Sequence, residues 1–375
     1  MKKDIIAKAA AGLAFGMLLS APHIAAAATQ PFAAVPGIQN RTITTIASTV
    51  PKNGDINPYG IVIVSESTGS LVKGDILISN FNDAKNLQGT GTTIMQISPS
   101  GRARQFAHID PNHLHGACPG GVGLTTALFA SRNGWVFVGS LPTTDGMSDT
   151  ARAGCIIVLN SLGQVVETFH GSLINGPWDM TGLDAGSRVG LWFTNVLNGT
   201  VNGHGKIVNG GTVVRMVVDT PFGSIPSVES MTVVGSGFPE HTDPAALVIG
   251  PTGVALSPDH HLLYVADSPN NRVAAISDPL TRTTSDGIGD TVTSGGSLND
   301  PLGMTLAPNG DILTVNGNNG FLVWTTPRGA QVRKDLLDGS GSPPGAGALF
   351  GIAVVPGVGL YFVDDATNTL DVFAR

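Results

Sequence analysis

A repeat dominates this 375-residue sequence and constrains its fold more than any other feature. Six segments begin with a similar short motif, in which a glycine or an aspartate serves as the anchor for alignment. The anchors are Gly60, Gly121, Asp179, Gly253, Gly303 and Gly351. Each is followed by an apolar strand, a turn, a second strand ending in small polar residues, a third strand and a more polar fourth strand. Six units of four antiparallel strands predict an all-β, six-bladed β-propeller.

The ends of the chain indicate how the ring closes. The sixth unit stops at Arg375 after its third strand, whereas residues 41–46 show an isolated strand pattern ahead of the first anchor. We expect this N-terminal strand to complete the last blade, because ring closure removes exposed sheet edges. The propeller is therefore predicted to span residues 41–375 as one domain, with residues 29–40 as a linker before it.

Blade four is similar to a known repeat. Residues 251–258 read Pro-Thr-Gly-Val-Ala-Leu-Ser-Pro, and residues 263–273 read Leu-Tyr-Val-Ala-Asp-Ser-Pro-Asn-Asn-Arg-Val. These segments resemble an NHL repeat, whereas blades five and six have Asn316 and Asp364 where blade four has Asp267. The resemblance implies a binding or sensing role, which is what NHL propellers mostly have. Related six-bladed propellers include gluconolactonase-like hydrolases, arylesterases and streptogramin lyases, so the fold leaves catalysis open.

Residues 1–28 have the parts of a secretory signal peptide. Lys2, Lys3 and Lys8 precede the apolar stretch 9–19, and four alanines at 25–28 provide a small-residue cleavage region. We expect cleavage near Ala28 and a secreted or periplasmic protein. No later segment has 18 consecutive apolar residues, which argues against membrane insertion.

The net charge argues against one class of partner, and the cysteine count allows one disulfide. The formal net charge is −7 and there is no basic run, so the chain has no electrostatic reason to bind nucleic acid. The two cysteines, Cys118 and Cys155, allow a single intrachain disulfide in an exported protein. Two unpaired cysteines in a packed interior are the alternative. We expect the protein to be a monomer.

The loops of a propeller fall on two faces, and here they are unequal. We call the first face the one that carries the connections into strand one and between strands two and three. It is predicted to hold the long loops 82–91, 141–153, 196–210 and 241–249. Long loops on a rigid scaffold commonly carry binding and catalysis, so we predict that this face is functional. The alternative is that these loops are tolerated insertions.

Candidate ligand-binding residues lie at the predicted channel mouth. Asp179 replaces the anchor glycine there, and Trp178 precedes it. Asn57, Asn175 and Asp300 also flank anchors. Carboxylate and amide oxygens are ligands for Ca²⁺, so Asp179 and Asn57 form a candidate site for Ca²⁺ or another divalent cation. A polar residue that merely begins a strand is the structural alternative.

Histidines complete the candidate ligand-binding set. They fall on or beside first-face loops, and they are His113, His115, His204 and His241. His113 and His115 would point to one side of an extended loop, and with His108 or His204 they could form a Zn²⁺ or Cu²⁺ site. A solvated histidine-rich loop is the alternative. Asn or Asp recurs at the ends of the second strands, which indicates a turn-forming role at those positions.

Two functions remain open on the sequence. No G-x-S-x-G motif is present, so a nucleophile-elbow hydrolase lacks its motif. Gluconolactonase-like propellers hold their divalent cation with Glu, Asn and Asp, and no Glu lies near an anchor in this chain. We therefore expect an exported binding, recognition or scaffold module for a small molecule, a glycan or a protein. The alternative is a divalent-metal-dependent hydrolase or lyase of the gluconolactonase-like superfamily.

Overall fold

The computed structural model describes residues 41–221 and 223–374, which belong to one compact unit beginning at Arg41. The predicted signal peptide, residues 1–28, and the predicted linker, residues 29–40, lie outside the described residues. Within the described part, no helix is both long enough and apolar enough to cross a membrane.

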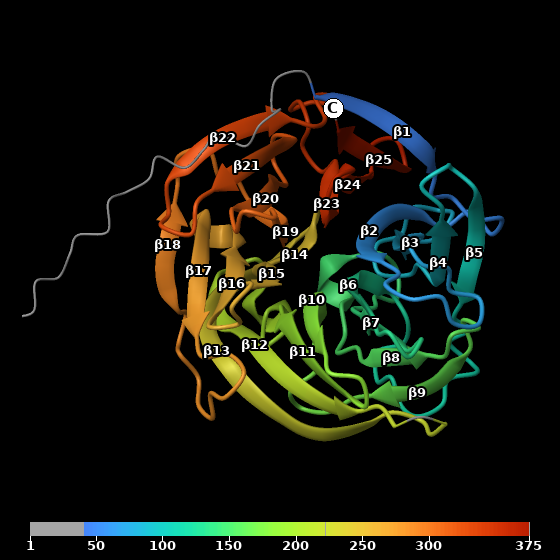
Figure 1. Cartoon of the computed structure of the whole chain (residues 1–375). Coiled ribbons are helices and arrows are strands. Elements are labelled where there is room, and N and C mark those ends of the chain that lie inside the picture. Colours follow the sequence, from blue (N-terminus) through green and yellow to red (C-terminus); the bar gives the residue numbers. More distant parts are fainter. Residues whose placement is uncertain (1–40, 222, 375) are drawn as a thin grey trace, which may run out of the picture. The chain divides into compact units, whose positions relative to one another are not determined.

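Six antiparallel sheets stand around a central channel as the blades of a propeller (Figure 1). Blade one consists of β2 (Ile56–Ile63), β3 (Ile76–Asn82), β4 (Thr93–Ile97) and β5 (Ala103–His108). Blade two consists of β6 (Leu124–Ala130), β7 (Val136–Ser140), β8 (Ile156–Leu159) and β9 (Val165–Phe169). Blade three consists of β10 (Pro177–Asp184), β11 (Arg188–Asn195), β12 (Val208–Asp219), β13 (Ser227–Asp243) and β14 (Leu247–Ile249).

The remaining blades have four strands each. Blade four consists of β15 (Pro251–Leu256), β16 (Leu262–Asp267), β17 (Arg272–Ser277) and β18 (Asp290–Ser294). Blade five consists of β19 (Pro301–Leu306), β20 (Ile312–Asn316), β21 (Phe321–Thr325) and β22 (Gln331–Leu336). Blade six consists of β23 (Leu349–Val355), β24 (Gly359–Asp364), β25 (Thr369–Ala374) and β1 (Thr42–Ser48). Three short 3-10 helices lie in connections: η1 (Ser148–Thr150), η2 (Val201–Gly203) and η3 (Ser268–Asn270).

Blade six confirms the predicted ring closure. β1 pairs antiparallel with β25, with Thr42 opposite Ala374, and the Thr45 hydroxyl donates a hydrogen bond to Asp371 over 2.6 Å. Figure 1 shows β1 at the outer edge of the blade that contains the C-terminal strands. The N-terminal strand thus covers an edge that would otherwise expose unpaired backbone groups.

The core lies between the blades, because each blade packs on a neighbour on both sides. β16 shows how this packing on both sides affects the residue pattern of a strand. Leu263 and Val265 pack toward blade three, while Tyr264 and Ala266 pack toward blade five. A strand that is buried on both faces has no polar alternation, so the middle strands of the blades read as continuous apolar runs.

The innermost strands set the width of the channel, and glycine anchors bring them close together. A Cβ atom on Gly303 would lie 1.8 Å from the Phe350 carbonyl oxygen, so only glycine fits the contact between β19 and β23. Blade two differs from the expected alignment. Its pairing of Leu124 with Ser140 corresponds to the pairing of Pro177 with Asn195, which places Thr126, not Gly121, at the anchor position.

Polar residues at the ends of the second strands fasten the connections, as predicted. The Asn195 side-chain oxygen accepts hydrogen bonds from the backbone N–H groups of Asn175 and Gly176. Asn316 does the same for Asn299 in blade five. These side chains are buried and occupied by backbone groups, so their role is structural.

Blade three departs from the prediction of a loop over 241–249. β13 continues to Asp243 and turns back into β14, which makes a five-stranded sheet. The Asp243 carboxylate accepts hydrogen bonds from the N–H groups of Ala245 and Ala246, which stabilises the tight turn. The expected loop 196–210 is likewise partly regular, since it contains η2 and the start of β12.

The predicted disulfide is present. Cys118 and Cys155 are bonded, with their Cα atoms 5.1 Å apart. Cys155 immediately precedes β8, and Cys118 lies in the connection before β6. The bond therefore fastens the long approach to blade two onto the third strand of the same blade.

Candidate functional site

A layer of aromatic side chains divides the central channel. Tyr59 stacks on Phe81 and Phe350, with ring centroids 4.4 Å and 3.9 Å apart, and Trp178 lies 6.3 Å from Tyr59. We call these four residues the aromatic layer. Tyr59, Trp178 and Phe350 lie near the starts of β2, β10 and β23, and Phe81 lies near the end of β3. All four are buried. One cavity lies on the first-face side of this layer, and a second lies beyond it.

The cavity on the first-face side, which we call the mouth pocket, has a volume of about 380 Å³. The β13–β14 hairpin from blade three reaches across it, and Figure 1 shows β14 within the ring. Leu247 and Val248 of the hairpin are buried against the aromatic layer. Gln88 from blade one donates a hydrogen bond to the Pro244 carbonyl at the hairpin turn. The hairpin thus forms a wall of the mouth pocket.

Two carboxyl groups line the mouth pocket, and burial raises the pKa of both. The pKa of Asp300 rises to about 6, with repulsion from Asp243 adding to the effect of burial and His241 opposing it. The pKa of Asp365 rises to about 7, with Asp364 adding to the effect of burial. Each of these carboxyl groups therefore gains or loses its proton close to neutral pH, as a general acid or base must.

Amide side chains supply further hydrogen-bonding groups. Those lining the pocket are Asn57, Asn82, Asn86, Gln88 and Asn318. Asn57 is only 6% exposed, and its side-chain oxygen has no hydrogen-bond partner among the described residues. Asn57 and Asp300 also have positive φ angles of 61° and 57°, a conformation that costs energy for most residues and that Asn and Asp tolerate best. The pocket therefore combines an aromatic floor with unsatisfied polar groups.

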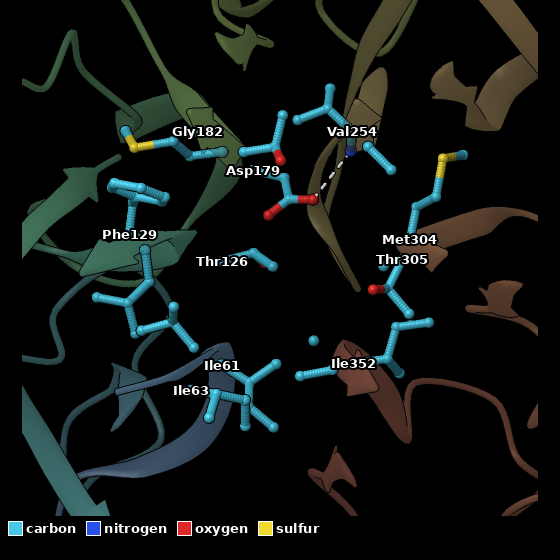
Figure 2. Close-up of a pocket in the computed structure, with 18 residues that line it drawn as sticks. Ile61, Ile63, Thr126, Phe129, Asp179, Gly182, Val254, Met304, Thr305 and Ile352 are labelled. Carbon is cyan, nitrogen blue, oxygen red and sulfur yellow. Dashed lines mark hydrogen bonds between the residues drawn. The ribbon is translucent and has the colours of Figure 1, made fainter. Parts of the chain in front are cut away.

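The second cavity, which we call the channel cavity, has a volume of about 230 Å³ and is drawn in Figure 2. Middle and C-terminal residues of the six innermost strands line it. Asp179 projects into this space, and its carboxylate accepts a hydrogen bond from the Val254 N–H over 3.0 Å. Burial raises the pKa of Asp179 to about 7, and hydrogen bonds from the backbone of Val254 and Met180 oppose the rise.

The structure separates several predicted site residues. Trp178 and Asn57 line the mouth pocket, whereas Asp179 lines the channel cavity. Asp179 and Asn57 therefore do not converge on one cation. Among the described residues, no group of three or more His, Cys, Asp or Glu side chains is placed to hold a metal ion.

The predicted histidines are also dispersed. His113 and His115 are exposed on the connection between β5 and β6, where the His113 Nδ1 lies 2.6 Å from an Asp110 carboxylate oxygen, and His204 is exposed on the connection before β12. His241 is the one of the four near the mouth pocket, since its charge acts on Asp300. Asp300 was predicted only to flank an anchor, and Asp365 was not predicted at all. The signal for Asp365 is its position directly after Asp364 at the end of a second strand.

Comparison with known proteins identifies solved structures that have the same fold. No protein-family model matches the chain, and no curated protein matches it. A gluconolactonase from Xanthomonas campestris is 13% identical, with 90% of each chain covered and a TM-score of 0.53. A virginiamycin B lyase from Staphylococcus aureus is 14% identical, with 90% of this chain and 100% of that chain covered and a TM-score of 0.50. The calcium-binding protein regucalcin from Agrobacterium tumefaciens is 14% identical, with 88% and 94% covered and a TM-score of 0.55. The chain therefore shares the six-bladed propeller fold of gluconolactonases, these lyases and regucalcin.

Proposed function

We propose that the mouth pocket hydrolyses a small cyclic ester by acid–base chemistry. The observation that carries the proposal is that Asp300 and Asp365, two carboxyl groups with raised pKa values, line one pocket. The solved structures with a similar fold include gluconolactonases, which supports a lactone as the substrate class. The steps described below use Asp300, Asp365 and a water molecule alone.

The two carboxyl groups would have different roles. Asp300 ionises above pH about 6, so it is the base that takes a proton from water as the water oxygen attacks the ester carbonyl. Asp365 retains its proton up to pH about 7, so it is the acid that protonates the leaving ring oxygen. The acyl C–O bond breaks, and one water molecule is consumed to give a hydroxy acid. The side-chain oxygen of Asn57 would accept a hydrogen bond from a substrate hydroxyl.

Turnover of δ-valerolactone, glucono-1,5-lactone and phenyl acetate, followed by pH-stat titration, tests the proposal. Asp300→Asn and Asp365→Asn should each lower kcat by roughly 10²–10⁴-fold. Asp290→Asn, at an exposed position on β18, is the matched control and should change nothing. The rate should be greatest between pH about 6 and about 7, where Asp300 is ionised and Asp365 is protonated. Unchanged turnover in both pocket variants would contradict the assigned roles.

Binding without turnover is the second candidate function. The aromatic floor and the ring of amides favour it, because stacking and amide hydrogen bonds together suit a polyhydroxylated molecule. The resemblance of blade four to an NHL repeat supports the same function. A sugar or lactone that binds in calorimetry and is recovered unchanged, with binding lost in Trp178→Ala, would favour this candidate over hydrolysis.

We also propose that the protein is exported. The disulfide between Cys118 and Cys155 supports this, since disulfides persist in oxidising compartments and are rare in the cytosol. N-terminal sequencing of the protein recovered from the periplasm or the medium should give a start near Thr29. A start at Met1, with the protein retained in the cytosol, would contradict export.

A further inference from the structure

The channel cavity is a second concave site, and the proposed hydrolysis does not use it. It lies beyond the aromatic layer, among the middle and C-terminal residues of the innermost strands. Thr126 on β6 and Asp179 on β10 are buried, whereas Thr181 farther along β10, and Ile63 and Thr305 near the C-terminal ends of β2 and β19, are partly exposed. This gradient shows that the cavity opens on the face opposite the mouth pocket.

The polar groups of the channel cavity arise from two exceptions to the glycine anchors. Four blades have glycine at the anchor position, while the neighbouring blades two and three have Thr126 and Asp179. Thr126 is 4% exposed, and its hydroxyl has no hydrogen-bond partner among the described residues. Asp179 is 8% exposed, and its bond to the Val254 N–H occupies one carboxylate oxygen. Two neighbouring strands thus present an unused hydroxyl and a carboxylate to the cavity.

The other walls are apolar and carry no positive charge. Figure 2 shows Asp179 directed into the cavity, with Ile61, Ile63 and Ile352 on the opposite wall and Phe129 to one side. Asp179 is the only titratable group among the described lining residues, and none of them is Lys, Arg or His. A buried carboxylate without a cation is costly, so the cavity favours a ligand that brings its own positive charge.

We propose that the channel cavity binds a small organic cation, a primary ammonium group attached to a short apolar body. The ammonium donates hydrogen bonds to the Asp179 carboxylate and to the Thr126 hydroxyl. The apolar body contacts Phe129 and Ile352, which removes apolar surface from water on both partners. A neutral analogue of the same shape keeps the apolar contacts and leaves the carboxylate unpaired, so it binds more weakly.

The affinity for such a cation should rise with pH. Asp179 has to be ionised to pair with the ammonium, and burial raises its pKa to about 7. The ionised fraction, and with it the association constant, increases about tenfold between pH 6 and pH 8. Val254 and Met180 contribute only backbone N–H groups to this carboxylate. The described lining residues include no second titratable group, so Asp179 alone determines how affinity depends on pH.

Isothermal titration calorimetry of the purified chain with benzylamine tests the proposal, and benzyl alcohol is the neutral comparison. Benzylamine should bind the native protein more tightly at pH 8 than at pH 6, and more tightly than benzyl alcohol. Asp179→Asn keeps an acceptor for the Val254 N–H and removes the charge, so it should weaken benzylamine at least tenfold. Thr305→Trp should block the cavity from its rim and leave Asp179 untouched.

Asp300→Asn, in the mouth pocket, separates the two sites and should leave benzylamine binding unchanged. Thermal melting of each variant establishes whether it is folded. If Asp179→Asn does not fold, Thr305→Trp is the variant that decides the test. The proposal is overturned if benzylamine gives no heat, if benzyl alcohol binds equally well, or if neither cavity variant weakens binding. The two proposals can fail separately. A protein without lactone turnover can still bind benzylamine in the channel cavity, and a protein that does not bind benzylamine can still hydrolyse a lactone in the mouth pocket.

Discussion

Replacement of Asp179 by asparagine should stabilise the protein at pH 8 and have little effect near pH 4. The carboxyl group has an ordinary pKa of 3.8, and burial raises its pKa to about 7 in the folded chain. Below pH 3.8 the group is protonated in both states and carries no penalty. Between pH 3.8 and about 7 the unfolded chain loses the proton while the folded chain retains it, so stability falls as pH rises.

The size of the effect follows from the two pKa values. At about 1.4 kcal/mol per pKa unit, the change from 3.8 to about 7 costs about 4 kcal/mol of unfolding free energy, and the cost is constant above pH 7. Asparagine has the same shape, stays neutral and still accepts a hydrogen bond from the Val254 N–H. The variant should therefore exceed the native protein by up to about 4 kcal/mol at pH 8.

Urea unfolding followed by tryptophan fluorescence between pH 4 and pH 8 measures this difference. Subtracting the native curve from the Asp179→Asn curve removes the contributions of the other buried carboxyl groups, because both proteins share them. Asp290→Asn, an exposed replacement, should give a flat difference near zero. A difference that does not grow with pH, or a variant that is less stable at pH 8, would refute the argument that burial dominates at Asp179.

Three further predictions concern the ring and its mouth. Reducing the Cys118–Cys155 disulfide, which spans 37 residues, should lower the unfolding free energy by about 3–4 kcal/mol, measured by urea unfolding with and without reductant. Deleting residues 41–48 should expose the edge of β25 and cause aggregation, detected by light scattering at increasing concentration. Leu247→Ala should cost about 2–3 kcal/mol and loosen the hairpin, because Leu247 is 2% exposed; acrylamide should then quench the neighbouring Trp178 more strongly.

The architecture was largely predictable because each strand carries its own signal. Apolar runs, bounding turns and the polar residue at the end of each second strand recur in every blade, and the structure repeats their order. The prediction of Gly121 as the anchor of blade two was wrong for a physical reason. Residues 119–122 match the motif locally, but pairing of Leu124 with Ser140 fixes the register, and pairing between strands is not visible along one strand.

The site was predictable only in part. The mouth pocket lies on the first face, whose functional role stays a prediction, and the predicted histidines do not converge there. The β13–β14 hairpin depends on a turn fastened by Asp243, and its contact with the aromatic layer is made across the ring. Asp179 was expected at the mouth, yet it lines the channel cavity, whereas the preceding residue Trp178 belongs to the aromatic layer.

The closing contact of blade six has a consequence for the order of events during synthesis. Thr45 and Asp371 are 326 residues apart, so the first strand to be made bonds to the last. At roughly 5–20 residues per second, about 15–65 s pass between the appearance of these two partners. Throughout that interval β1 lacks its native partner, because it pairs with β25. The propeller can therefore become a closed ring only after β25 has been made.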